Sequence, residues 1–302
     1  MYGSAPHFVC QLGLKNICTF QPQEAQGMQR HGRPSPPLLL AFTSGPRIGR
    51  YPTIYVQSSS LGDFVAFHLP TIPGRFVLIT GLSDAPIDPQ LPAYRPLFDS
   101  PKLVQAYAQN GCCTHSKLTI LPIGIDYHTG MQPTLFGMGK VVFHQGSQPS
   151  PEEQDAQLRR ISKGLKHFSQ RIPSCFSNFD DKCESRKLAH KEVSQDLVRN
   201  VPTGTDRMKT WEEQGKHAFV ISPIGNGLDC HRTWEALALG CIAIVDRTPI
   251  SPVFEDLPVL IVDRWSEVTR ERLDKTLIEF GERSFNMDKL TLKYWKDKIT
   301  AH

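Results

Sequence analysis

The sequence predicts an α/β protein with two Rossmann-like domains. Short runs of β-type apolar residues alternate with stretches of helical pattern along most of the chain. This alternation is typical of parallel sheets whose strands are connected by helices. A length of 302 residues suits two medium-sized domains. A segment rich in Gly, Ser and Pro, "HQGSQPSPEEQ" at 144–154, separates the two halves.

The first half divides into a lead-in and a predicted domain. Residues 1–37 mix Gln, Gly, Pro and His without helical or strand periodicity, so we expect a loosely ordered segment that carries no chemistry. Residues 38–149 are predicted to form the first domain. Its expected strands are the runs "LLLAFTSG", "TIYVQSS", "RFVLITGLSD" and "KLTILPIGIDYHT", and its expected helix is "SPKLVQAYAQN".

The second predicted domain covers residues 150–302. Ser150 and Pro151 fit the N-cap and first helical position of its opening helix. The runs "SCFSNFD", "HAFVISP", "CIAIVD" and "LPVLIVD" predict four buried strands, and helices are expected at about 184–199, 229–239 and 266–280. The repeated strand-then-helix order is that of a Rossmann-like domain, in which ligands bind beyond the carboxyl ends of the strands.

The overall charge argues against a nucleic-acid-binding protein. The chain has 34 basic and 30 acidic residues, a formal net charge of +4 and a pI near 8.6. These charges are scattered, without a long run of one sign. We therefore expect no nucleic-acid partner. An anionic small molecule is compatible, since it needs only a local positive site.

The apolar runs predict no membrane span in this chain. The longest of them, "PPLLLAF" at 36–42, is too short to cross a bilayer, and the first residues do not resemble a signal sequence. As written, the chain is expected to be cytoplasmic, or to lie in the Golgi lumen if an N-terminal anchor is missing from it.

The eight cysteines predict neither a zinc module nor a disulfide scaffold. They form no C-x-x-C pair, and we expect most of them to be buried thiols. Cys175 and Cys183 flank one predicted loop, so a bridge between them in an oxidising compartment stays an alternative.

The segment "ISPIGNGLDCHRTWEAL" at 221–237 concentrates polar residues between a predicted strand and a predicted helix. Gly225 and Gly227 allow a ligand to approach the backbone closely, because neither has a Cβ. The following helix is expected to begin near Leu228 or Asp229, and its N-terminus favours anions. Arg232 adds a forked cation suited to phosphate oxygens. The segment therefore predicts an anion site.

Helical spacing places His231, Arg232 and Glu235 close together, with His231 and Glu235 one turn apart. A carboxylate here can hold ribose hydroxyls, whereas Arg232 and Glu235 could instead form a surface ion pair. Asp229 fits an N-cap better than a ligand contact. A zinc hydrolase site on Cys230, His231 and Glu235 is a weaker alternative, because no third ligand has a characteristic spacing.

These residues carry a resemblance to a known family. "FVISPIGNGLDCHRTWEALALGCIAIV", "LPVLIVDRWSEVT" and "KLTLKYWKDKI" are similar to the donor-binding half of exostosin-like glycosyltransferases, especially the compact group of algae and large algal viruses. The upstream runs "FVLITGLSD", "SPKLVQAYAQN" and "LPIGIDYHT" extend the similarity to about residues 50–299. The resemblance implies a GT-B architecture, with two Rossmann-like domains facing across a cleft. It makes residues 38–149 the acceptor side and residues 150–302 the nucleotide-sugar side.

The resemblance also implies roles for individual residues. Gly225, Asn226 and Gly227 would line the phosphates, Arg232 would neutralise the diphosphate leaving group, and Glu235 would hold the ribose. Together with Asp229, His231 and Ser251 they form the predicted nucleotide-sugar-binding set. Neither a cofactor nor a metal is expected.

One segment departs from the family pattern. After "IVD" the chain reads "RTPISPVFEDLP", with Ser251 and Phe254 where an acidic residue and a tyrosine are expected. This departure favours the alternative of a nucleotide-sugar-binding protein that keeps the fold without catalysing transfer.

The acceptor side is expected to supply a base if transfer inverts the anomeric centre. Asp126 and His128 follow a buried run in "LPIGIDYHTG" and are the preferred candidates, with Asp126 favoured for its place nearer the strand end. Asp63 and Asp84 are competitors at other strand ends, where each would otherwise be a turn residue. A retaining mechanism would need no such base.

The sequence therefore predicts a glycosyltransferase of glycan biosynthesis. Its donor is expected to be a UDP-linked sugar, for which the resemblance suggests a pentose such as xylose, and its acceptor a carbohydrate or glycoprotein. Replacing Arg232 or Glu235 by Ala is expected to weaken nucleotide binding without unfolding the chain. The alternative is a non-catalytic nucleotide-sugar or glycan-binding protein that keeps the fold.

Overall fold

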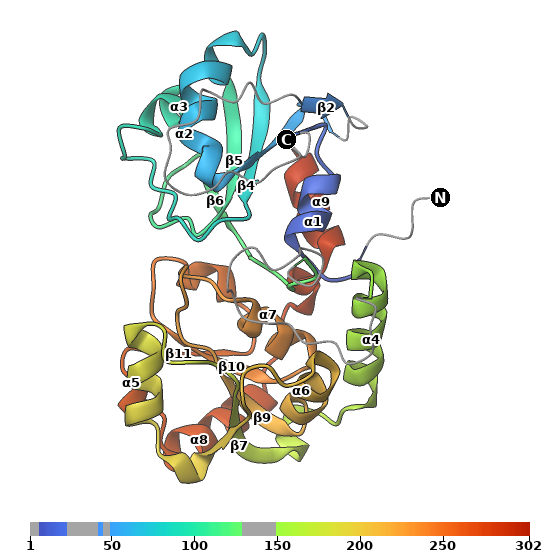
Figure 1. The fold of residues 1–302 in the computed structure, drawn as a ribbon, viewed down its shortest axis with the longest axis vertical. Coiled ribbons are helices and arrows are strands. Elements are labelled where there is room, and N and C mark those ends of the chain that lie inside the picture. Colours follow the sequence, from blue (N-terminus) through green and yellow to red (C-terminus); the bar gives the residue numbers. More distant parts are fainter. Residues whose placement is uncertain (1–5, 23–41, 45–48, 129–148) are drawn as a thin grey trace.

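Two α/β units form the molecule, and each is built around its own sheet (Figure 1). The computed structural model describes residues 6–22, 42–44, 49–128 and 149–302. The first sheet uses strands up to residue 121, and the second begins at residue 172. Helix α4, Pro151–Gly164, stands between them in the chain.

The first sheet contains six strands among the described residues, in the order β2-β1-β3-β4-β5-β6. Strands β1 and β2 are antiparallel. The other neighbouring pairs, β1–β3, β3–β4, β4–β5 and β5–β6, are parallel. Short helices α2 (Leu61–Asp63) and α3 (Arg95–Asp99) lie along this unit. The strands are β1 (Phe20–Pro22), β2 (Phe42–Ser44), β3 (Thr53–Gln57), β4 (Phe76–Gly81), β5 (Leu103–Gln109) and β6 (Leu118–Leu121).

Strand β5 corrects the helix predicted for "SPKLVQAYAQN". Its Ala and Gln residues favour helices in isolation, but here Leu103 and the run Ala106–Ala108 are buried between β4 and β6. A central parallel strand is covered on both faces and does not need polar–apolar alternation. Tertiary packing therefore overrides the local preference.

The second sheet is parallel throughout, in the order β11-β10-β9-β7-β8. The four predicted strands are confirmed as β7, β9, β10 and β11. The strands are β7 (Ile172–Ser177), β8 (Val198–Asn200), β9 (His217–Ile221), β10 (Ile242–Asp246) and β11 (Val259–Val262). The helices are α5 (Glu184–Glu192), α6 (Arg207–Gln214), α7 (His231–Ala238) and α8 (Arg270–Gly281).

One predicted helix of the second domain ends earlier than expected, whereas another begins where it was predicted. The helix expected at 184–199 stops at Glu192, and its last predicted turn is replaced by the edge strand β8. The opening helix α4 begins as predicted: Ser150 caps it, accepts the Glu153 N–H at 3.2 Å and completes a capping box, with Pro151 in the first turn.

Residues 6–22 correct the expectation of a loosely ordered lead-in. They form α1 (Gln11–Asn16) and β1, and the side chains of Leu14 and Cys18 are fully buried. Helix α1 packs against the last helix, α9 (Leu292–Thr300), as the blue and red helices show in Figure 1. Residues 1–5 and 23–37 of the predicted lead-in lie outside the described residues.

The carboxyl ends of the two sheets meet, which confirms the predicted GT-B class of two Rossmann-like domains. The segment after β6 reaches the segment after β9, where the Ile123 N–H donates to Asp229 at 2.7 Å. Apolar side chains form one cluster across this junction, from Tyr55 and Tyr107 in the first sheet to Trp234 beside the second. No described helix is long and apolar enough to cross a membrane.

Candidate functional site

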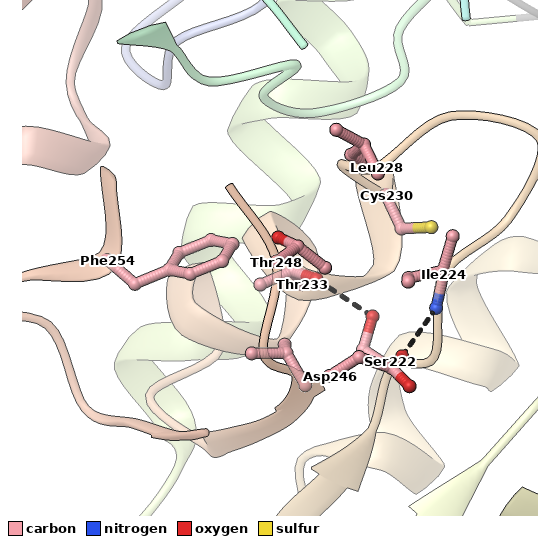
Figure 2. Close-up of a pocket in the computed structure, with 9 residues that line it drawn as sticks. Ser222, Ile224, Leu228, Cys230, Thr233, Asp246, Thr248 and Phe254 are labelled. Carbon is pink, nitrogen blue, oxygen red and sulfur yellow. Dashed lines mark hydrogen bonds between the residues drawn. The ribbon is translucent and has the colours of Figure 1, made fainter. Parts of the chain in front are cut away.

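A pocket lies at the carboxyl ends of β9 and β10, where Rossmann-like domains bind ligands (Figure 2). Ser222 and Thr233 face each other in its floor, with their hydroxyl oxygens 2.8 Å apart. Thr248 and Phe254 close another side, and the buried Thr248 hydroxyl has no hydrogen-bond partner among the described residues. The lining of the pocket therefore contains a buried polar atom without a partner among the described residues.

Asp246 anchors the glycine turn to this pocket. Its carboxylate accepts the Ile224 N–H at 2.9 Å (Figure 2). It also accepts the Ser185 hydroxyl at 2.8 Å. The first bond holds the start of "IGNG", and the second holds the first turn of α5. One carboxylate at the end of β10 thus fixes two segments that line the site.

The guanidinium group of Arg186 lies against Gly225. A Cβ on this glycine would lie 3.0 Å from Arg186 Nη2 and 3.2 Å from Cys230 Sγ, so a larger residue would crowd both. Arg186, in the first turn of α5, forms an ion pair with Asp180 at 2.7 Å, while its buried Nε atom has no partner among the described residues.

Arg232 is held in place from two sides. Its Nε and Nη2 atoms donate to the Asn178 carbonyl at 3.2 and 2.9 Å, and its guanidinium lies 5.3 Å from the ring centre of Phe179. Burial lowers the pKa of Arg232, and the positive charge of Arg186 lowers it further. The positive charges of Arg186 and Arg232 repel each other, and a bound anion would relieve this repulsion.

Sequence reasoning missed Arg186. It lies in the first turn of the helix after β7, as Arg232 lies in the first turn of the helix after β9. This repeated strand–turn–helix placement was the available signal.

Gly227 lies against the first domain. A Cβ there would be 2.8 Å from Asn110 Nδ2 and 3.2 Å from Asp84 Oδ1. Asn110 also accepts the Asp229 N–H through Oδ1 at 3.0 Å, so it ties the glycine turn to the end of β5. The close packing explains glycine at this position, and Asn226 between the two glycines is exposed.

Asp229 is a buried structural acceptor, and it does not cap α7. The cap position is Cys230, and the helix begins at His231, later than expected. The Asp229 carboxylate accepts the N–H groups of Ile123 and Cys230 and the indole N–H of Trp234 at 2.7 to 2.9 Å. Burial raises its pKa to about 6, although these bonds oppose the shift.

His231 meets Asp126 and His128 across the domain junction. Its Nδ1 atom lies 2.7 Å from the Gly124 carbonyl, and its ring centre is 5.4 Å from that of His128. Asp126 Oδ1 accepts the His128 backbone N–H at 3.1 Å and lies 3.2 Å from the His128 Nδ1 atom. The structure thus brings three predicted site residues from two domains together.

Gly124 and the N-terminal segment position this cluster. Gly124 has a φ of +71°, and a Cβ on it would lie 2.1 Å from the Val9 carbonyl oxygen. The Ile125 N–H donates to the same carbonyl at 2.9 Å, while the Val9 N–H donates to Leu290 at 2.8 Å. The N-terminal segment, which the sequence predicts to carry no chemistry, therefore positions the backbone that carries Asp126.

Glu235 points to a partner that the sequence did not predict. Its Oε1 atom accepts a hydrogen bond from Arg207 Nη2 at 2.6 Å, and the two side chains are only 16% and 6% exposed. Arg207 opens α6 and also lies over the Trp211 ring. Its Nε and Nη1 atoms have no partner among the described residues. The predicted alternative of an Arg232–Glu235 surface pair is wrong.

The remaining predicted residues lie apart from this cluster. The Ser251 hydroxyl accepts the Thr248 N–H at 3.0 Å, which stabilises the turn after β10. Asp63 is exposed on α2, whereas Asp84 lies beside Gly227.

The cysteine and zinc alternatives are not supported. All eight cysteines are free thiols, including Cys175 and Cys183. Burial raises the pKa of Cys230 to about 11, so this thiol stays protonated at neutral pH. Among the described residues, the group of His, Cys, Asp and Glu side chains close enough to share a metal is Asp126, His128 and His231.

The pKa of His128 predicts a pH-dependent stability. Burial lowers it below the usual 6.5, and Asp126 offsets this only in part. The unfolded chain then binds a proton more readily than the folded one, so stability is lost as the pH falls below about 6.5. We expect the free energy of unfolding to fall more steeply from about pH 7 to pH 5 in the wild type than in His128→Gln.

Denaturant titrations at each pH give these free energies. Burial also lowers the pKa of His217, but this residue is present in both proteins and cancels in the comparison. Parallel curves for the two proteins would contradict the lowered pKa of His128.

The comparisons with known proteins concern the fold. No family model and no curated protein matches the chain. The structure is similar to an alpha1,3-fucosyltransferase with GDP-fucose, at 10% identity and a TM-score of 0.38, over 86% of this chain and 93% of that one. It is also similar to a glycosyltransferase from Rickettsia africae ESF-5, at 10% identity and a TM-score of 0.35, over 82% and 72% of the two chains.

Proposed function

We propose that the chain is an exostosin-like glycosyltransferase that moves a sugar from a nucleotide-diphosphate sugar to a glycan or glycoprotein acceptor. One observation carries the proposal. A glycine turn with Arg186 against it lies at the carboxyl edge of one Rossmann-like sheet, and Arg232 interacts electrostatically with Arg186 there. The Asp126–His128 pair lies at the facing edge of the other sheet. This arrangement supports a donor site and a base on opposite sides of one reaction centre.

Departure of the diphosphate needs positive charge near its oxygens. The sugar passes through an oxocarbenium-like state while negative charge grows on the leaving group. Arg232 and Arg186 supply two guanidinium groups, and Gly225 lets the phosphates approach the backbone. In this proposal the side chains supply the needed charge, and the transfer uses no cofactor or metal. The family resemblance supports a UDP-linked donor, with a pentose such as xylose.

The acceptor hydroxyl loses its proton during an inverting transfer. The lowered pKa of His128 keeps its imidazole neutral near pH 7, so it can accept that proton. Asp126 lies at the Nδ1 side of the same ring, where a carboxylate orients the imidazole and stabilises its protonated form. In this assignment His128 is the base and Asp126 positions it, which reverses the preference drawn from sequence order.

A release assay tests the proposal directly. The full chain is incubated with UDP- and GDP-sugars and a set of glycan acceptors, and the free diphosphate and the glycosylated product are measured. Product formation with one donor supports the proposal. Diphosphate binding without product supports the second candidate, a nucleotide-sugar-binding protein without transferase activity.

The segment after β10 favours that second candidate. Phe254 is 5% exposed and packs 5.9 Å from the Trp234 ring, so the position of the expected tyrosine belongs to the apolar core. Ser251, at the position of the expected acid, is engaged with the Thr248 backbone. Neither residue offers the family's functional group to a sugar.

Arg232→Ala is expected to weaken diphosphate binding while the chain stays folded. Losing a charge-assisted contact costs about 1.5 to 3 kcal/mol, or roughly a tenfold to hundredfold rise in Kd. Isothermal titration with UDP and GDP measures this change. Arg160→Ala, on the exposed face of α4, is the matched control and should bind as the wild type does. Equal affinity for Arg232→Ala would remove this residue from the site.

A further inference from the structure

The cluster at the domain junction has the donor set of a transition-metal site. The ligand atoms of Asp126, His128 and His231 all lie within 4.8 Å of one another. Each atom would have to move inward by less than about 1 Å to reach a Zn–N or Zn–O bond of about 2.1 Å. Two imidazoles and one carboxylate, with an open fourth position, form a common zinc ligand set.

His231 is already oriented as metal-binding histidines are. Its Nδ1 atom lies 2.7 Å from the Gly124 carbonyl, which can only accept a hydrogen bond. The proton therefore sits on Nδ1, and Nε2 keeps the lone pair that a metal needs. A carbonyl that fixes the tautomer in this way is the usual outer partner of a ligating histidine.

Hydrogen bonds, a close backbone contact and burial position these donors. The backbone at Gly124 and Ile125 contacts Val9, whose carbonyl accepts the Ile125 N–H. Two residues further along the chain from Asp126, the His128 N–H donates a hydrogen bond to the Asp126 carboxylate. The side chains of Asp126 and His128 are only 12% and 23% exposed. Donors that are held in place lose little conformational freedom on binding, which favours affinity.

We propose that Asp126, His128 and His231 bind one Zn²⁺ ion that bridges the two domains. The first two ligands come from the segment after β6 and the third from the start of α7, so the ion joins both sheets. This binding does not depend on the proposed transferase activity. If that activity is present, zinc coordinates His128 and Asp126, so His128 can no longer accept the proton of the acceptor hydroxyl. Bound zinc therefore inhibits transfer.

The test uses the full chain, stripped with a chelator and titrated with Zn²⁺ alone. A competition titration against a chromophoric chelator is expected to show one tight site per chain. His231→Gln and Asp126→Asn should each weaken it by more than about 100-fold, since even outer partners are worth 10- to 100-fold. His167→Gln, which removes an exposed imidazole on another surface, is the matched control and should bind zinc as the wild type does.

Cobalt gives a second readout on the wild-type protein. Co²⁺ in a four-coordinate nitrogen and oxygen site is expected to give visible absorption bands that Zn²⁺ abolishes in a one-to-one ratio. An intense near-ultraviolet thiolate band would place the metal on cysteines and overturn the proposal. Absence of a tight site in the wild type, or unchanged affinity in both variants, would also overturn it. If one variant does not fold, the other variant and the cobalt spectrum decide.

Discussion

His128→Gln and Asp126→Asn are each expected to lower the turnover of sugar transfer by about a hundredfold or more, the usual worth of a general base. Nucleotide affinity should stay nearly unchanged, because both residues belong to the acceptor side and the two guanidinium groups lie elsewhere. Initial rates and titrations with the diphosphate, both in the presence of EDTA, separate the two effects and exclude any contribution from bound metal.

The double variant is the decisive comparison. Residues that act as one unit are not additive, so removing both should cost little more than removing either one. Asp63→Asn makes the same change on the exposed surface of α2 and should retain full turnover. Full activity in both site variants would show that Asp126 and His128 do not act as the base. Asp84, beside Gly227, would then be the next candidate, or the mechanism would be a retaining one that needs no base.

Glu235→Ala is expected to destabilise the protein by about 3 to 5 kcal/mol. The change leaves the guanidinium of Arg207, 6% exposed, without the carboxylate that binds it at 2.6 Å. A buried charge without a partner is costly because it has lost its hydration. Much of the lost stability therefore comes from Arg207, which keeps its charge but has no carboxylate beside it. Chemical denaturation followed by circular dichroism measures the loss. The sequence alone predicts weaker nucleotide binding with the fold intact, whereas the buried ion pair adds an expected loss of stability.

A paired variant separates the fold from binding. Arg207→Met with Glu235→Leu replaces the ion pair by apolar side chains of similar length, a change that is often neutral for stability. We expect the double variant to recover most of the lost stability. If it then binds UDP or GDP like the wild type, Glu235 acts on structure alone, and if binding stays weak, Glu235 also contacts the nucleotide. A Glu235→Ala protein as stable as the wild type would contradict the buried ion pair.

The second sheet was predictable because each of its main strands is a short run of buried apolar residues. "HAFVIS" and "CIAIVD" are compact apolar runs of strand type, and the helix cap at Ser150 follows from local chemistry. Strand β5 was not predictable in the same way. Its Ala and Gln residues favour a helix until both faces are covered by neighbouring elements that lie far away in sequence.

The site was predictable only in part. The sequence places Gly225, Gly227, Arg232 and the "GIDYH" segment just after predicted strands. Ligands of Rossmann-like domains bind at the carboxyl ends of the strands, so these positions could be predicted. The partners of Asp229 and Glu235 could not be inferred, because Ile123 and Arg207 are distant in sequence. Arg186 and Arg207 look like ordinary surface residues of polar helices until burial and missing partners distinguish them.

Helix α9 has a practical consequence for dividing this molecule into fragments. The helix follows the second sheet in sequence but packs on α1, and the Tyr107 hydroxyl of the first sheet donates to the Lys298 carbonyl at 2.9 Å. A fragment starting at Ser150 would lack α1 and the first sheet, against which α9 packs, and would leave that side of the helix uncovered. Such a fragment should aggregate, whereas a cut before Thr291, with the helix supplied in trans as a peptide, offers a route to reassembling the two lobes from separate pieces.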